Sequence, residues 1–156
     1  NMKKPRIIVI AHRIRSLYNV GSFFRTCDAI GAEKIYLSGY TASPKDQPIR
    51  LAKTALGAEQ TVDWEKVKTL PPLIKKLKTK GYEIIALEET KGQSIDYRKW
   101  SPSDKVAIIL GNEVKGISKV IRDKCNKVIE LPMLGKKKSL NVSVSLGAIG
   151  FYILGK

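Results

Sequence analysis

Short apolar runs recur along the chain, each bounded by polar or turn-forming residues. Several are nearly continuous Val, Ile and Leu, which is typical of strands covered on both faces of a parallel sheet. Five runs predict strands, over residues 7–11, 34–37, 83–87, 106–110 and 127–131. Helical patterns lie between these runs, so the sequence predicts an α/β fold with a mainly parallel sheet flanked by helices.

Four segments carry helical patterns. In residues 20–30 an apolar stripe covers one face, and Gly31 suits the position just after a helix end. A second stripe spans 64–80, although Pro71 also allows a helix that starts there. The remaining helices are predicted over 117–125 and 140–154, with loops over 38–56, 88–105, 111–116 and 135–139.

The charge of the chain narrows its partners. With 29 Lys and Arg against 14 Asp and Glu, the 156 residues carry a net charge of +15, which favours binding to a polyanion. An anionic membrane surface is the alternative to nucleic acid, and we favour nucleic acid. This length and a hydrophobic fraction of 43% predict one folded domain over residues 2–156. Asn1, which precedes Met2, is expected to be a remnant of expression.

Few residues are available for metal or disulfide chemistry. Cys27 and Cys125 form neither a disulfide framework nor a metal pattern, and the only histidine is His12. For His12 the sequence leaves substrate contact and a plain surface position equally open. No apolar run approaches the about 20 residues of a membrane helix, and no signal peptide is recognised. We therefore expect a cytoplasmic protein without a metal.

Three segments combine glycine with polar residues where helices begin. The first starts at Asn19, which is expected to cap the following helix. Gly21 is expected to allow a close approach of backbone, and Arg25 to project outward, opposite the apolar stripe. A capped helix with a surface arginine would have the same pattern, so this segment alone decides nothing.

The second segment follows the strand predicted over 106–110. It places Gly111, Glu113 and Gly116 before the next helix. The C-terminal ends of parallel strands are where α/β proteins bind ligands, and Gly111 would let a flat ligand approach the backbone. A plain turn with two glycines is the alternative. A phosphate-binding loop is disfavoured, since the chain has neither G-x-x-x-x-G-K-[ST] nor G-x-G-x-x-G after a strand.

The third segment, residues 131–145, reads LPMLGKKKSLNVSVS. Ser139, Asn141 and two further serines place polar groups at a helix start, where the helix dipole favours an anion or a negatively charged ligand group. One cap needs only one such residue, so we favour a ligand site over several caps in a row. For the three lysines at 136–138, contact with RNA phosphates and a solvated loop both stay open.

Together, the three segments resemble the SpoU (TrmH-like) family of RNA ribose methyltransferases, part of the SPOUT class. The first matches the family's N-x-G-x-x-x-R motif, the second its L-G-x-E-x-x-G motif, and the third its [IL]-P-M-x-G-x-x-x-S-L-N-V-S-V motif. The three occur in the family's order and spacing, and the third is highly specific. Residues 53–59 are also similar to a family segment, so the resemblance covers nearly the whole chain.

The resemblance implies a C-terminal part tied in a deep trefoil knot, against the general expectation of unknotted chains. It also implies that S-adenosylmethionine is bound in the knot, largely by backbone groups. By family position, the cofactor-binding residues are Leu110, Gly111, Leu131, Met133 and Leu140. The implied reaction transfers a methyl group to a ribose 2′-hydroxyl of tRNA or rRNA.

The resemblance further implies a catalytic set. Its members are Arg25, Asn19, Glu113, Ser139 and Asn141. The family gives the arginine a catalytic role, sometimes as general base. Because arginine stays protonated in proteins, we expect Arg25 instead to steer the adjacent phosphate and to stabilise a developing alkoxide. Asn19 is expected to order the loop beside Arg25.

The family's enzymes work as homodimers. We therefore expect two copies to share one RNA surface, with the helix that contains Gly147 and Gly150 at a two-fold interface. Close helix packing within one chain is the alternative for these glycines.

Two other functions stay open, a catalytically silent RNA-binding module and a knotted base methyltransferase. The complete catalytic set argues against the first, and the 139–141 run favours ribose over a base. The lack of an extra RNA-recognition domain slightly favours tRNA over rRNA.

Overall fold

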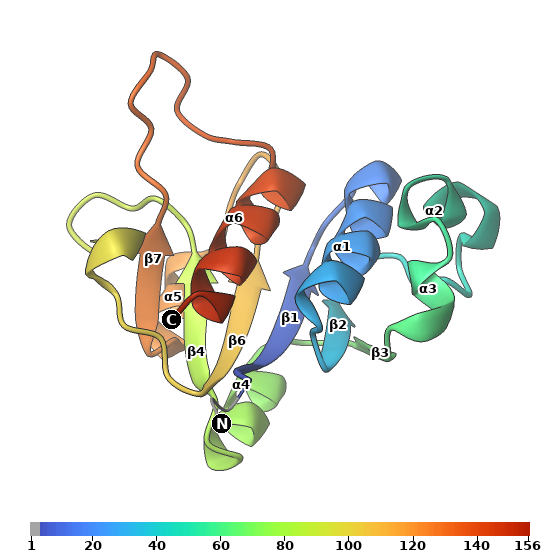
Figure 1. Cartoon of the computed structure of the whole chain (residues 1–156), viewed down its shortest axis with the longest axis horizontal. Coiled ribbons are helices and arrows are strands. Elements are labelled where there is room, and N and C mark those ends of the chain that lie inside the picture. The colour runs from blue at the N-terminus through green and yellow to red at the C-terminus, as the bar shows by residue number, and fades with distance from the viewer. Residues whose placement is uncertain (1–3) are drawn as a thin grey trace.

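The computed structural model describes residues 4–156, which form a seven-stranded sheet with helices on both faces (Figure 1). The strand order is β3-β2-β1-β6-β4-β7-β5, and every neighbouring pair is parallel. The strands are β1 (Arg6–His12), β2 (Lys34–Ser38), β3 (Trp64–Val67), β4 (Glu83–Leu87), β5 (Ile95–Asp96), β6 (Lys105–Leu110) and β7 (Lys127–Glu130). The expected α/β fold is confirmed, whereas Asn1 and Met2 lie outside the described residues.

The sheet separates two apolar cores. The helices are α1 (Leu17–Ile30), α2 (Pro48–Ala55), α3 (Ala58–Thr61), α4 (Pro71–Thr79), α5 (Lys119–Lys124) and α6 (Val142–Leu154), with a 3₁₀ turn η1 (Tyr97–Lys99). Alternate residues of β1 enter the two cores, because Ile7 and Val9 join the core of α1 and α6, whereas Ile8 and Ile10 join that of α4 and α5. This is why the strand is a continuous apolar run in the sequence.

The prediction of one helix over 64–80 is wrong. Trp64–Val67 forms the edge strand β3, which pairs with β2, and α4 begins at Pro71. Proline fits that first position because its missing N–H would have no partner inside the helix. The four residues of β3 are too few to show an alternation of apolar and polar positions. The predicted loop over 88–105 also contains regular structure, β5 and η1.

Helix α2 lies inside the segment 38–56, which we predicted as a loop. It buries only Leu51 and Ala55, so it has no apolar stripe to find in the sequence. Its backbone lies against α1 at Gly21, where a Cβ atom would be 2.0 Å from Thr54 Oγ1 and 2.6 Å from the Leu51 carbonyl oxygen. The close backbone approach expected at Gly21 is therefore an approach of two helices.

The C-terminal ends of the strands share one edge of the sheet, because all the strands are parallel. After β7, residues 131–141 make a long excursion without helix or strand before α6 begins, drawn in orange and red above the sheet in Figure 1. Open parallel sheets bind ligands at this edge. The trefoil knot in this part of the chain stays a prediction.

Candidate active site

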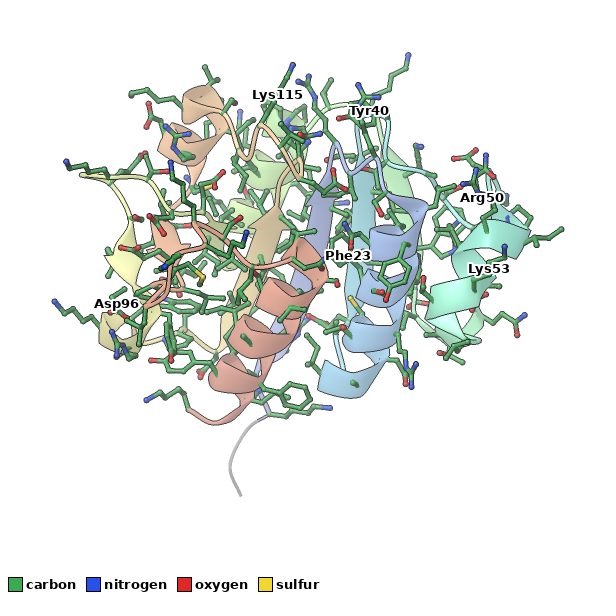
Figure 2. All side chains as sticks on the ribbon, turned by 90° about the horizontal axis from the view of Figure 1, so that it is seen from above. Phe23, Tyr40, Arg50, Lys53, Asp96 and Lys115 are labelled. Atoms are coloured by element: carbon green, nitrogen blue, oxygen red, sulfur yellow. The ribbon has the colours of Figure 1, made fainter. Side chains whose placement is uncertain are left out.

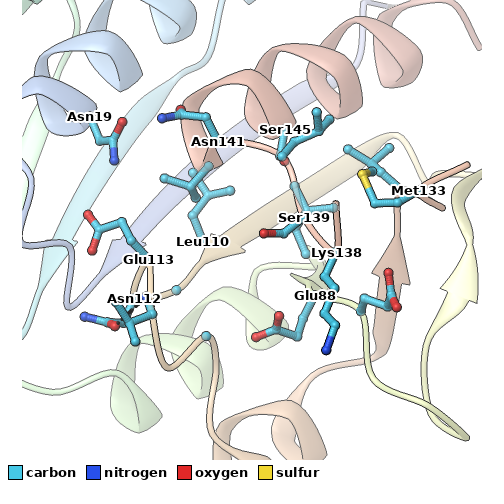
Figure 3. A pocket seen from close by; sticks show the side chains of 18 residues that line it. Asn19, Glu88, Leu110, Asn112, Glu113, Met133, Lys138, Ser139, Asn141 and Ser145 are labelled. Atoms are coloured by element: carbon cyan, nitrogen blue, oxygen red, sulfur yellow. Dashed lines mark hydrogen bonds between the residues drawn. The ribbon is translucent and has the colours of Figure 1, made fainter. Parts of the chain in front are cut away.

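A cavity of about 640 Å³ opens at the C-terminal edge of the sheet (Figure 3). The first turn of α1, the end of β4, the loop after β6 and the excursion before α6 each contribute to its wall. Its volume falls in the range of about 300–1,000 Å³ that is usual for sites of small ligands and cofactors. Segments that are distant in the sequence thus meet around one site.

All five predicted cofactor-binding residues line this cavity. They are Leu110, Gly111, Leu131, Met133 and Leu140. Among the described residues, no backbone hydrogen bond of a turn, loop or cap involves residues 132–140. Backbone donors and acceptors must find partners when they are buried. This part of the wall therefore has backbone polar groups available to a ligand.

Four of the five predicted catalytic residues also line the cavity. They are Asn19, Glu113, Ser139 and Asn141. The fifth, Arg25, does not. Its side chain is exposed on α1, as expected, and borders a separate hollow with Asp28 and residues 55–58. A single copy of the chain thus brings together the predicted cofactor-binding residues and four of the predicted catalytic residues, but not the arginine.

Asn19 does not cap α1, which corrects the expectation from the sequence. The cap is Ser16, whose Oγ accepts a hydrogen bond of 3.1 Å from the Asn19 N–H, so that Asn19 lies inside the first turn. The Asn19 side chain is 5% exposed, and its Oδ1 has no hydrogen-bond partner among the described residues. A buried acceptor without a partner is rare in proteins. Since Asn19 borders the cavity, a ligand donor is a fitting partner.

Glu113 holds the loop that precedes α1. Its carboxylate accepts hydrogen bonds from the backbone N–H groups of Ser16, at 3.1 Å, and Arg15, at 3.4 Å. Glu113 therefore fixes the start of α1, and with it the position of Asn19, from a loop almost a hundred residues later in the chain. Figure 3 shows Glu113 and Asn19 on the same side of the cavity.

Gly111 is needed for the tight turn of its own loop. A Cβ atom there would lie 2.7 Å from the backbone oxygen of Gly116, because the loop turns back on itself through the bond from Gly116 N–H to the Asn112 carbonyl oxygen. The plain turn, left open in the sequence, thus explains this glycine by itself. Gly111 nonetheless lines the cavity, so its backbone is also available to a ligand.

The sequence analysis missed Glu88 and Glu89, which line the cavity at the end of β4. Glu88 Oε2 accepts a hydrogen bond of 2.6 Å from the Ile117 N–H and so holds the far end of the 111–116 loop. The signal was present, because both carboxylates follow a buried strand at its C-terminal end. The cavity wall carries three carboxylates, from Glu88, Glu89 and Glu113. Lys138 is the only cation among the described residues that line it. This excess of negative charge favours a cationic ligand.

The polar residues at the start of α6 have two different roles. Asn141 is the N-cap, and its Oδ1 accepts from the Ser143 N–H at 2.8 Å and the Ser143 hydroxyl at 2.6 Å. Ser139 and Ser145 line the cavity and take no part in this cap. The row of polar residues is therefore more than repeated capping.

His12 is half-buried, and its Nδ1 lies 2.7 Å from the Ser38 hydroxyl. Burial, and then the charge of Arg13, lowers the pKa of His12 to about 4, so the ring is neutral at pH 7. Residues 4–156 contain no group of three His, Cys, Asp or Glu side chains that could hold a metal ion. In the same range no helix is both long and apolar enough to span a membrane.

Comparison with known proteins now identifies the family. The model of the SpoU rRNA methylase family matches residues 6–151. This chain belongs to that family. The resemblance drawn from the three motifs is confirmed, and residues of the second and third motifs line the cavity together with Asn19 of the first.

Two curated relatives show what this SpoU chain is similar to. It is 33% identical to the 23S rRNA (guanosine-2′-O-)-methyltransferase RlmB of Neisseria meningitidis, over 96% of this chain and 58% of that protein. It is 34% identical to the tRNA (guanosine(18)-2′-O)-methyltransferase of Aquifex aeolicus, over 94% of this chain and 68% of that protein. The chain thus spans little more than half the length of RlmB.

A solved structure agrees with this SpoU assignment. The AdoMet-bound rRNA methyltransferase from Sinorhizobium meliloti matches with a TM-score of 0.86 at 25% identity, over 96% of this chain and 56% of that one. The sheet and its flanking helices therefore match the fold of this solved rRNA methyltransferase.

Proposed function

We propose that this chain is an S-adenosylmethionine-dependent RNA methyltransferase that acts on a ribose 2′-hydroxyl. One observation carries the proposal: a single cavity is lined by all five predicted cofactor-binding residues and four of the five predicted catalytic residues. The relatives named as 2′-O-methyltransferases of rRNA and tRNA support it. So does the net charge of +15, which favours an RNA partner.

The cavity fits the proposed cofactor. When bound, S-adenosylmethionine supplies a methyl group on a positively charged sulfur, and the carboxylates in the wall favour such a charge. The backbone groups of 132–140 would hold its planar base, together with Leu110 and Gly111. Asn19 Oδ1, buried and without a partner, would accept a hydrogen bond from the bound molecules.

The remaining residues would orient the attacking hydroxyl. Ser139 and Asn141 lie at the N-terminal end of α6, where the helix dipole favours the negative charge that develops on the ribose oxygen. Glu113 acts through the backbone, because its carboxylate holds the start of α1. Arg25 is proposed to steer the phosphate next to the reacting ribose through its guanidinium group.

We propose that the chain works as a homodimer through α6. Val144 and Phe151 are more than half exposed on one face of this helix, and a Cβ at Gly147 on that face would meet nothing within 4 Å. Gly150 differs, because a Cβ there would lie 2.9 Å from Ile30 Cδ1. Packing within one chain thus explains Gly150, whereas Gly147 and its apolar neighbours are left for a second copy.

A dimer would also explain the position of Arg25, which its own chain holds outside the cavity. We propose that Arg25 serves the cavity of the other copy. Mixing Arg25→Ala with Asn141→Ala subunits tests this. Shared sites predict recovery of about a quarter of wild-type activity, since half of the dimers are mixed and each has one intact site. No recovery after subunit exchange would exclude sharing.

The central experiment measures transfer of labelled methyl groups from S-adenosylmethionine to bulk tRNA and rRNA, followed by mapping of 2′-O-methylated positions. Arg25→Ala should abolish transfer and leave cofactor affinity unchanged by calorimetry. Arg98→Ala is the matched control, because that exposed arginine pairs with Asp96 far from the cavity. Normal turnover by Arg25→Ala would contradict the assignment. Cofactor binding without any transfer would favour a silent RNA-binding module, and a methylated base would favour the third alternative.

The proposal extends to the whole of residues 2–156 as one methyltransferase domain. The family match over residues 6–151 and the single sheet support it. A cytoplasmic location is proposed with it, because that is where tRNA and rRNA are used.

A further inference from the structure

Tyr40 is an exposed aromatic residue that contacts Asn112, one of the residues that line the cavity. It follows β2 and is 47% exposed. The Arg15 guanidinium carbon lies 4.9 Å from its ring centroid, and its hydroxyl accepts a hydrogen bond of 2.8 Å from Asn112 Nδ2. Figure 2 shows Tyr40 near Lys115, whose N–H bonds the same asparagine side chain. Asn112 also lines the cavity, so Tyr40 is one side chain away from the proposed active site.

Three loops fix this arrangement. The loop after β1 is held on one side by the buried Thr41 hydroxyl, which accepts from the Ile14 N–H at 3.0 Å. On the other side, Asn112 Nδ2 donates to the Arg13 carbonyl oxygen at 3.1 Å, and Glu113 accepts from the Ser16 N–H. Hydrogen bonds therefore fix the backbone of the loop that carries Arg15 to the loop that carries Tyr40 and to the loop after β6. A surface pair fixed in this way is prepared for binding, because little freedom is lost when a ligand arrives.

The charges around Tyr40 suit a phosphate backbone. Arg13, Arg15 and Lys115 are exposed, and none of them forms an ion pair with a carboxylate in the part of the chain that the structure describes. The bond to Asn112 uses only the Tyr40 hydroxyl, so the half-exposed ring is left available to a ligand. An aromatic ring combined with a guanidinium is the arrangement on which proteins stack unpaired nucleobases.

We propose that Tyr40 and Arg15 form a stacking platform for an unpaired nucleobase of the RNA, next to the nucleotide whose ribose enters the cavity. The inference rests on the proposed function, because it names how the same site holds its RNA. The base would stack on the exposed side of the pair, while Lys115 and Arg13 contact phosphates. Stacking tolerates any base, so this platform contributes affinity and position rather than sequence choice.

Binding of two matched probes tests the platform. One is a short fluorescent oligoadenylate, and the other is an abasic ribose-phosphate oligomer of the same length and charge. We expect Tyr40→Leu to weaken binding of the oligoadenylate on the order of ten- to a hundredfold. Binding of the abasic oligomer should not change. Tyr40→Phe should keep most of the affinity, because the ring remains.

Lys115→Ala is the electrostatic control. It should weaken both probes equally and lower the dependence of binding on salt concentration, whereas Tyr40→Leu should leave that dependence unchanged. Unchanged affinity of Tyr40→Leu for oligoadenylate would overturn the proposal. So would an equal loss for both probes, with the melting temperature and cofactor affinity intact, because tyrosine would then act without the base. Methyl transfer by the wild type is measured separately, so a failure of the proposed enzyme is distinguishable from a failure of the platform.

Discussion

Gly21 gives the sharpest test of how the first motif is built. A Cβ atom at this position would lie 2.0 Å from Thr54 Oγ1 and 2.6 Å from the Leu51 carbonyl oxygen. The Thr54 hydroxyl can rotate away, but it then loses its hydrogen bond of 2.9 Å to the Tyr18 carbonyl oxygen. The Leu51 carbonyl belongs to the backbone of α2, so that whole helix must move. We therefore expect Gly21→Ala to destabilise the protein, although alanine is the better helix former.

The magnitude follows from three opposing effects. Overpacking costs about 1–3 kcal/mol, and the lost hydrogen bond about 1 kcal/mol. The higher helix propensity of alanine returns about 1 kcal/mol. The net loss in the free energy of unfolding is about 1–3 kcal/mol. For a chain of 156 residues this lowers the melting temperature by about 3–10 °C.

Thermal and urea unfolding measure this loss. Gly147→Ala is the matched control when both variants are made in the Phe151→Asp background, which is expected to be monomeric. This helical glycine has open space within its own chain where the methyl group would go, so stability should be unchanged or higher. In the double variant Gly21→Ala/Thr54→Ala, the loss should be smaller than the sum of the two single losses, since one clash has been removed. A Gly21→Ala protein that melts above the wild type would refute the packing argument.

Three further predictions concern the interface, the histidine and the second motif. Phe151→Asp should convert the dimer to monomers, as measured by light scattering. The control Ile49→Asp changes an apolar residue on α2 that is 78% exposed and should leave the dimer intact. A dimeric Phe151→Asp protein would contradict the α6 interface. The pKa of His12 should be near 4 in an NMR titration, which is unambiguous for the only histidine. Because the pKa of His12 in the folded protein is below its unfolded value of about 6.5, the neutral ring favours the folded state. This contribution to stability is complete above pH 6.5 and is lost as the pH falls toward 4, so His12→Asn should lack this part of the acid dependence. Glu113→Ala should speed amide exchange at Ser16 and lower the free energy of unfolding by about 1 kcal/mol, whereas Glu89→Ala, which removes another carboxylate of the cavity wall, should do neither.

The strands that lie inside the sheet could be predicted from the sequence, and the elements at its periphery could not. β1, β4 and β6 bury residues on both faces, so each is a continuous apolar run. The edge strand β3 and the helix α2 bury little, and tertiary contacts rather than their own patterns define them. Pro71 indicated the correct start of α4, whereas Trp64 and Val67 before it belong to β3 and wrongly extended the predicted helix.

The candidate site divides in a similar way. The family resemblance identified nine of the residues that line the cavity, but not Glu88 and Glu89, which meet them there because the strand ends of a parallel sheet converge. Spacing did not show that Ser16, and not Asn19, caps α1, since both are good capping residues within one turn. Nor did it show that Arg25 lies outside the cavity, because one and a half helical turns separate it from Asn19 and point it elsewhere.

The loop over 111–116 would couple the two ligands that we propose for this chain. Its backbone lines the cavity at Gly111, its Asn112 amide holds Tyr40, and its Glu113 carboxylate holds the start of α1. The proposed cofactor and RNA would therefore contact opposite sides of one short, hydrogen-bonded turn. Any adjustment of that turn by the first ligand changes the affinity for the second, and thermodynamics makes the effect equal in both directions. The loop is thus the natural place for cooperativity between the two substrates, which comparison of cofactor affinity with and without RNA would measure.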